Sequence, residues 1–242
     1  MKALVAQTRS ELMLSLRNGE QLLVNIAIPL LLLVFFSAVK VLPIPTGVDK
    51  RVDFLAPGII ALAVMSNAMV ALAIGTGFER HYKVLKRLGS TPLGRGRWVL
   101  AKIGMVKILL IVQIALIVIA AFLLGWNPGG NPWLAIPAVV LGAFAFGGIG
   151  LLMAGTLRGT VTLALANGLY LLLLLLGGMI IPFSEMPGFL GTIGKVLPSG
   201  ALSQVLQSCL RSGAPVAGSA WIVLGVWAVL APLAAVKFFR WE

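Results

Sequence analysis

Residues with the chemistry of catalysis or metal binding are scarce in this chain of 242 residues. Cys209 is the only cysteine and His81 the only histidine. One cysteine allows neither an intrachain disulfide nor a cysteine-based zinc site, and one histidine supports neither a Ser-His-Asp set with a spare ligand nor a multi-histidine metal site. The sequence therefore predicts no catalytic residue, no metal site and no cofactor bound by this chain.

The chain also lacks the means to power transport by itself. A P-loop requires G-x-x-x-x-G-K-[ST], and the nearest string, Gly194-Lys195, is followed by Val196 and lacks the upstream glycine. No Asp or Glu lies in the middle of an apolar segment, whereas ion-coupled carriers bury an ionisable relay. If the protein drives transport, the energy must come from a partner.

The most charged segment is 79–97, ERHYKVLKRLGSTPLGRGR. Its cations alternate with apolar side chains in a pattern that suits a short helix with mixed faces. Gly89 can end this helix, and Thr91-Pro92 can restart the chain in a new direction. A connection between two membrane helices needs fewer residues, so we interpret the loop as a contact site for another protein. The alternative is a loop that touches only lipid headgroups.

Amide side chains fall inside long apolar segments, where polar groups are costly. Asn67 and Asn167 lie near the middles of two segments, and Gln113 lies at mid-depth in a third. Each could line a substrate path, but hydrogen bonding between helices is the commoner role of such residues. Both interpretations stay open.

The segment 182–215 contains two apolar helix patterns, at 189–197 and 202–210, and neither is long enough to cross a membrane. Glycines and prolines separate them. Two short helices of this kind fit a re-entrant hairpin in the outer leaflet, where non-helical backbone must be surrounded by protein or water. The alternative is an amphipathic loop on the membrane surface.

The elements that must position these residues are membrane-spanning helices. Apolar residues make up 60% of the chain and charged residues 11%, whereas soluble domains are about a quarter charged. A helix of about 20 apolar residues crosses a bilayer. The fold class is therefore all-α, a polytopic membrane protein with one transmembrane domain over 1–242. The predicted spans are 22–42, 54–78, 99–124, 133–157, 161–181 and 218–238.

Residues 1–21 predict an amphipathic helix in front of the first span. Apolar side chains recur there at helical spacing between basic and polar ones, so the helix would lie at the cytoplasmic interface with its cations among lipid phosphates. The alternative is an ordinary basic N-terminus that helps to set the topology. The window 22–42 is too long for the apolar core of a cleaved signal peptide.

Positive charge predicts the orientation. The net charge is +12, and with both termini in the cytoplasm 13 cations fall on cytoplasmic segments and five on outer ones, with Lys107 inside the third span. Cytoplasmic loops carry the excess of Lys and Arg. Segment 79–97 is therefore cytoplasmic and 182–215 is outer. The charge pattern indicates membrane lipid, and not nucleic acid, as the partner of these cations.

In this order and at these distances the segments resemble the membrane subunit of ABC-2 type transporters, in particular the daunorubicin-resistance-like permeases of bacteria. The resemblance covers nearly the whole chain. Besides the N-terminal helix and the six spans, it rests on Leu85-Lys86-Arg87-Leu88-Gly89-Ser90-Thr91-Pro92-Leu93, Ile181-Pro182-Phe183, Met186-Pro187 and Leu197-Pro198.

The resemblance implies a multi-pass permease of the bacterial plasma membrane, paired with a second permease copy or a homologous permease. Cytoplasmic ABC ATPase subunits would bind ATP and Mg. Residues 1–21 would be the connecting helix. The ATPase-coupling residues would be Glu79, Arg80, Lys83, Leu85, Lys86, Arg87 and Leu88. The outer gate would be formed by Pro182, Phe183, Pro187, Phe189 and Pro198, and the substrate path would be lined by Asn67 and Asn167.

Such permeases commonly export drugs, lipids or glycan precursors, so the resemblance implies ATP-driven export of a hydrophobic or amphipathic substrate. ATP binding would push the coupling helices and shift the permease pair from inward-open to outward-open. The alternative is a self-sufficient channel or secondary carrier. A membrane-embedded enzyme or assembly scaffold is a further alternative, and the absence of nucleophile–base sets argues against the enzyme.

Overall fold

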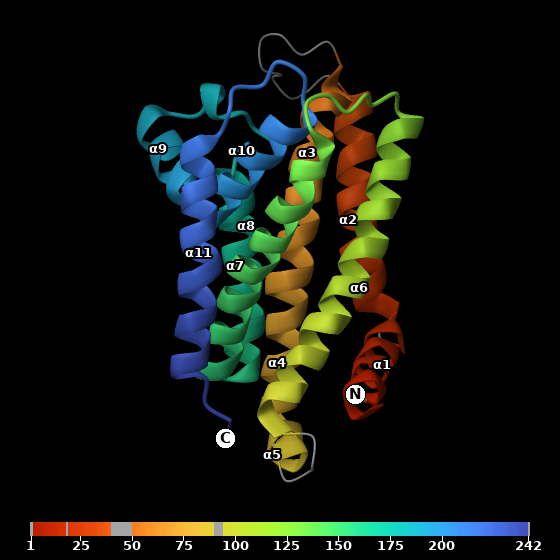
Figure 1. Ribbon diagram of the computed structural model, residues 1–242, viewed down its shortest axis with the longest axis vertical. Coiled ribbons are helices and arrows are strands. Elements are labelled where there is room, and N and C mark those ends of the chain that lie inside the picture. Colours follow the sequence, from red (N-terminus) through yellow and green to blue (C-terminus); the bar gives the residue numbers. More distant parts are fainter. Residues whose placement is uncertain (1, 18, 40–49, 90–93, 242) are drawn as a thin grey trace.

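The computed structural model is a bundle of helices, with no strand among the described residues (Figure 1). It describes residues 2–17, 19–39, 50–89 and 94–241. The elements are α1 (Lys2–Arg17), α2 (Gly19–Ala38), α3 (Arg51–Met65), the π-helix η1 (Ser66–Ala71), α4 (Leu72–His81), α5 (Val84–Gly89), α6 (Gly94–Leu123), the 3₁₀ turn η2 (Pro132–Leu134), α7 (Ala135–Thr156), α8 (Gly159–Leu176), the 3₁₀ turn η3 (Phe183–Glu185), α9 (Gly188–Val196), α10 (Pro198–Leu210) and α11 (Gly218–Phe238). The predicted all-α class is confirmed for this part of the chain.

Helices long and apolar enough to cross a membrane match five of the six predicted spans. The first predicted span, 22–42, corresponds to α2, whose apolar part Asn25–Ala38 is shorter. Residues 40–42 lie outside the described part of the chain, so a sixth span remains a prediction. The five matching helices are Arg51–His81, Gly96–Leu123, Pro132–Thr156, Gly159–Leu176 and Gly218–Phe238.

The continuous helix made of α3, η1 and α4 is the centre of the bundle. In its most apolar window 83% of the residues are buried, against 22–39% in the other four candidate spans. α7, α10, α2, α6 and α8 pack around it. Large apolar side chains on α6, α8 and α11 point outward instead, as expected for helices in contact with lipid.

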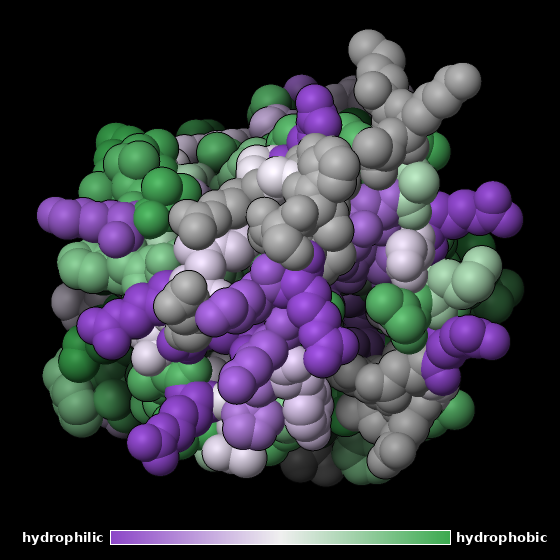
Figure 2. Space-filling model, turned by 90° about the horizontal axis from the view of Figure 1, so that it is seen from below, coloured by the Kyte–Doolittle hydropathy of each residue, from purple (hydrophilic) through white to green (hydrophobic). Residues whose placement is uncertain are grey.

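The two ends of the bundle carry different elements. α5 lies at the same end as both marked termini, and α9 and α10 lie at the other (Figure 1). We call the first the basic end, because hydrophilic side chains gather over it (Figure 2). Lys83 before α5, Lys86 and Arg87 in α5, and Arg158 between α7 and α8 are exposed cations. The predicted topology requires this separation, and the assignment of the basic end to the cytoplasm remains a prediction from charge.

The middle of the central helix is π-helical, which the spacing of apolar residues does not reveal. π-helical turns are rare in proteins, and many of those that do occur lie at functional sites. The backbone of α7 comes close here, because a Cβ atom at Gly150 would lie only 2.8 Å from the carbonyl oxygen of Met69. Gly150 belongs to the small-residue pattern of α7, together with Ala143, Gly147 and Ala154, that allows helices to pack closely.

Candidate functional site

α5 presents its cations away from the bundle. A turn at Lys83 joins it to α4, and Lys83 has a φ of 59°, a left-handed conformation uncommon for a residue other than glycine. Leu85 is 1% exposed, and α5 packs against α4 and α6, whereas Lys83, Lys86 and Arg87 are exposed. Leu85 therefore anchors the short helix, and the cations are left accessible. Leu88 belongs to α5, but its side chain lies outside the described part of the structure.

Arg80, also predicted to couple to an ATPase, points into the bundle. Its Nη1 donates hydrogen bonds to the carbonyl oxygens of Ala154, at 3.2 Å, and Leu157, at 3.0 Å. The backbone N–H of Arg240 donates to the carbonyl oxygen of Gly155 at 3.0 Å. The last carbonyls of a helix have no partner within the helix, and basic side chains there satisfy them. Arg80 thus ties α4 to the end of α7.

Glu79 takes part in a buried ionic cluster that the sequence did not reveal. Nζ of Lys102 lies 2.5 Å from Oε2 of Glu11 and also pairs with Oε1 of Glu79. Lys102 is 4% exposed, Glu11 5% and Glu79 21%. Buried charges need partners because their desolvation is costly. We call these three residues the ion triad, and it ties α1, α4 and α6 together.

The predicted interhelical role of the amides is visible at Asn67. Its Nδ2 donates to Oε1 of Gln113, whose Nε2 donates to the backbone oxygen of Asn25 at 2.7 Å. Ser66 Oγ lies 3.4 Å from Oδ1 of Asn25. These four residues form the amide cluster, which joins α2, η1 and α6. Asn67 is therefore fixed between helices within one chain.

Asn167 is placed differently. It is exposed on α8, and its Nδ2 donates to the carbonyl oxygen of Leu163 in the same helix at 2.9 Å. The outward side of α8 is otherwise apolar, with Leu171 and Leu175 both exposed. One chain therefore does not bring Asn67 and Asn167 into one site.

The segment predicted to form an outer gate folds as α9 and α10. The ring of Phe183 is wedged against Gly178, Gly194 and Gly200, where a Cβ atom would collide with it or lie within 3.1 Å. The ring of Phe183 therefore packs the segment before α9 against the start of α10. The re-entrant depth of this hairpin remains a prediction. Among the predicted gate residues, the buried ones are Pro182 and Pro198, the half-buried one is Phe183, and the exposed ones are Pro187 and Phe189.

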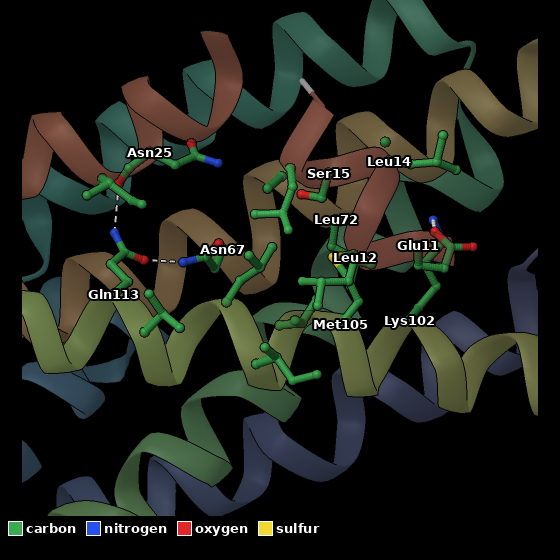
Figure 3. Close-up of a pocket in the computed structure, with 18 of the residues that line it drawn as sticks. Glu11, Leu12, Leu14, Ser15, Asn25, Asn67, Leu72, Lys102, Met105 and Gln113 are labelled. Atoms are coloured by element: carbon green, nitrogen blue, oxygen red, sulfur yellow. Dashed lines mark hydrogen bonds and ion pairs between the residues drawn. The ribbon is translucent and has the colours of Figure 1, made fainter. Parts of the chain in front are cut away.

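A cavity of about 360 Å³ lies between α1, α2, α4 and α6. Asn25, Asn67 and Gln113 of the amide cluster line one end. The ion triad lines the other, with Leu12, Leu72 and Met105 between them (Figure 3). Neither the hydropathy of the sequence nor the spacing of its polar residues indicates this cavity, because its walls come from four helices.

These features define a class. The described residues contain no group of three or more His, Cys, Asp and Glu side chains that could hold a metal ion. Their polar side chains instead join apolar helices, and one end displays a basic helix. This arrangement is that of a multi-pass membrane protein.

The comparison with known families makes the class specific. The family model of the ABC-2 type transporter matches residues 2–209, so the chain belongs to this family, and the resemblance drawn from the sequence is confirmed. The chain is also similar to "Putative transport permease YvfS" of Bacillus subtilis (strain 168). The two are 26% identical over 224 residues, which cover 89% of this chain and 88% of that protein.

Proposed function

We propose that this chain is the permease subunit of an ATP-driven exporter of a hydrophobic or amphipathic substrate. A separate cytoplasmic ATPase binds ATP and Mg and supplies the energy. A second permease copy, or a homologous permease, completes the path across the bacterial plasma membrane. Membership of the ABC-2 family supports the transport role. The geometry of the basic end supports the assignment of ATP hydrolysis to a separate subunit that docks there.

The observation that carries the proposal is the placement of α5. The helix stands at the basic end with Lys83, Lys86 and Arg87 exposed, and it is attached directly to the most deeply buried helix of the bundle. A protein that binds these cations can therefore displace the centre of the permease. A loop that served only to connect α4 with α6 would need no such helix.

The ion triad extends this connection. When the ATPase moves α5, α4 moves with it, and Glu79 transmits the displacement to Lys102 of α6. Lys102 passes it on to α1 through its pairing with Glu11. α1 is the predicted connecting helix, so the two elements expected to contact the ATPase are linked to each other inside the membrane subunit. Nucleotide can then bias two arrangements of one connected unit.

The test is capture of an ATP-binding partner. The tagged permease is purified from its native membrane after mild cross-linking, and bound proteins are labelled with 8-azido-ATP. We expect a labelled ATPase with the wild type and about a tenfold loss of label with Lys86→Glu/Arg87→Glu, because charge reversal at an interface replaces attraction by repulsion. Arg158→Glu is the matched control, since Arg158 is an exposed cation at the same end but outside α5.

Two results would count against the proposal. One is full retention of the labelled partner by the double charge reversal, with the variant normally inserted. The other is solute flux in proteoliposomes that contain this chain alone and an ion gradient, which would favour a self-sufficient channel or secondary carrier.

A further inference from the structure

The cavity between α1, α2, α4 and α6 has the dimensions of a binding site for one small molecule. Its volume of about 360 Å³ falls within the range of about 300–1,000 Å³ typical of ligand pockets. It is formed within one chain, beside the basic end. Its middle is lined by aliphatic side chains of α4 and α6, namely Leu72, Met105, Val106 and Leu109.

Most polar groups of the cavity gather at its two ends, and Ser15 of α1 lies between them. At one end the amides of Asn67 and Gln113 donate and accept hydrogen bonds, and at the other stands the ion triad (Figure 3). A few convergent polar groups on apolar walls are the usual composition of a small-molecule site. Such walls suit a ligand with an apolar body and polar groups at its ends.

The formal charge of the lining selects the sign of the ligand. Glu11, Glu79 and Lys102 are the charged residues that line the cavity, and their sum is −1. The second carboxylate oxygen of Glu79, Oε2, is buried and accepts no hydrogen bond within the described structure. Buried polar atoms are nearly always hydrogen-bonded, so this oxygen lacks a donor. A protonated amine in the cavity would supply the missing positive charge beside Glu79.

We propose that this cavity binds a small lipophilic amine in its cationic form, with the ammonium group beside Glu79 and the apolar body along α6. The inference rests on the proposed function and narrows its substrate class from amphipathic molecules to amphipathic monocations. It also places a binding site inside each permease chain, so occupancy does not require a second copy.

Gly75 allows the site to be altered without touching the ion triad. It lines the cavity, and a Cβ atom at this position meets nothing within 4 Å. A side chain added there can therefore enter the cavity without displacing backbone. Gly225 of α11 is a matched control, because its Cβ position is equally open and it is not among the lining residues.

The experiment measures binding by the full chain alone in lipid nanodiscs, with empty nanodiscs as the background. Dansylcadaverine, a fluorescent amine, is compared with dansyl-6-aminohexanoic acid, which carries a carboxylate in place of the ammonium group. We expect saturable binding of the amine at least about tenfold tighter than that of the acid, since opposite charges attract strongly in a poorly solvated site. Gly75→Lys should weaken amine binding about tenfold more than Gly75→Gln, and Gly225→Gln should leave it unchanged.

Equal affinity for the two probes, or no saturable binding above empty nanodiscs, would overturn the proposal with the wild-type protein alone. An equal loss of amine affinity in Gly75→Gln and Gly225→Gln would show that the amine binds outside this cavity. The assay contains no ATPase, so a negative result here leaves the capture of an ATPase partner unaffected. Conversely, failure of that capture leaves amine binding intact, which distinguishes the two ideas.

Discussion

Removal of the shared ammonium group of the ion triad is the sharpest test of how the basic end is held together. Lys102→Met keeps a long apolar side chain but leaves the carboxylates of Glu11 and Glu79 without their partner. Glu11 and Lys102 are 5% and 4% exposed, so water replaces the lost pairing at Glu11 only poorly. Breaking a buried pair in this way costs about 3–5 kcal/mol.

The lower part of that range is expected, because Glu79 is 21% exposed and borders the cavity. For a chain of this length, 1 kcal/mol corresponds to about 2–4 °C in Tm, so Lys102→Met should lower Tm by about 6–12 °C in lipid nanodiscs. The triple variant Glu11→Gln/Lys102→Met/Glu79→Gln removes all three charges and should recover most of the loss. Replacement of a whole buried ionic group by neutral residues is often nearly neutral.

The assay is thermal unfolding of purified variants in nanodiscs, with Lys107→Met as the control because Lys107 is exposed on the same helix. A Tm within about 2 °C of the wild type for Lys102→Met would refute the reasoning. So would a triple variant as unstable as the single one, since the penalty would then not arise from unpaired charge.

Three further substitutions test the contacts of the central helix by the same measurement. Asn67→Leu should cost about 1 kcal/mol, typical of an interhelical hydrogen bond in a membrane, whereas Asn167→Leu on the exposed side of α8 should change little; equal effects would contradict the amide cluster. Arg80→Gln should cost about 1.5–3 kcal/mol, since two hydrogen bonds from a charged donor to the end of α7 are lost; an unchanged Tm would mean that the guanidinium is not needed there. Gly150→Ala should cost about 1–3 kcal/mol through overlap with the π-helical turn, while Gly225→Ala should be neutral or stabilising; similar values for both would exclude the close approach of α7.

Hydropathy and charge predicted the architecture well. Lipid exposure demands long apolar runs, so five predicted spans coincide with helices of the bundle. Short apolar runs bounded by Gly and Pro predicted α9 and α10, and the basic string predicted α5. The apolar runs and the basic string are local features of the sequence. Each reflects whether a single helix contacts lipid or water, and not how that helix packs against others.

The contacts that organise the site could not be predicted in this way. Glu11, Glu79 and Lys102 come from three separate elements, and each looks like an ordinary interfacial charge when its own helix is considered. The composition offered one hint, because the chain has only 7 acidic residues and an excess of basic residues with which they can pair. These charges pair because they are buried where α1, α4 and α6 meet, and the spacing of residues within one helix does not show this. The same holds for Arg80, whose partners are backbone carbonyls.

The shortness of α8 has a consequence for the membrane around the protein. Its 18 residues rise about 27 Å along the axis at 1.5 Å each, slightly less than a hydrocarbon core of about 30 Å. A helix shorter than the surrounding hydrocarbon is accommodated by local thinning of the bilayer or by association with another protein. Because α8 also turns an apolar face outward, hydrophobic mismatch concentrates on this side of the bundle. If two copies pair along α8, the pairing would relieve this mismatch, and bilayer thickness would then tune its strength.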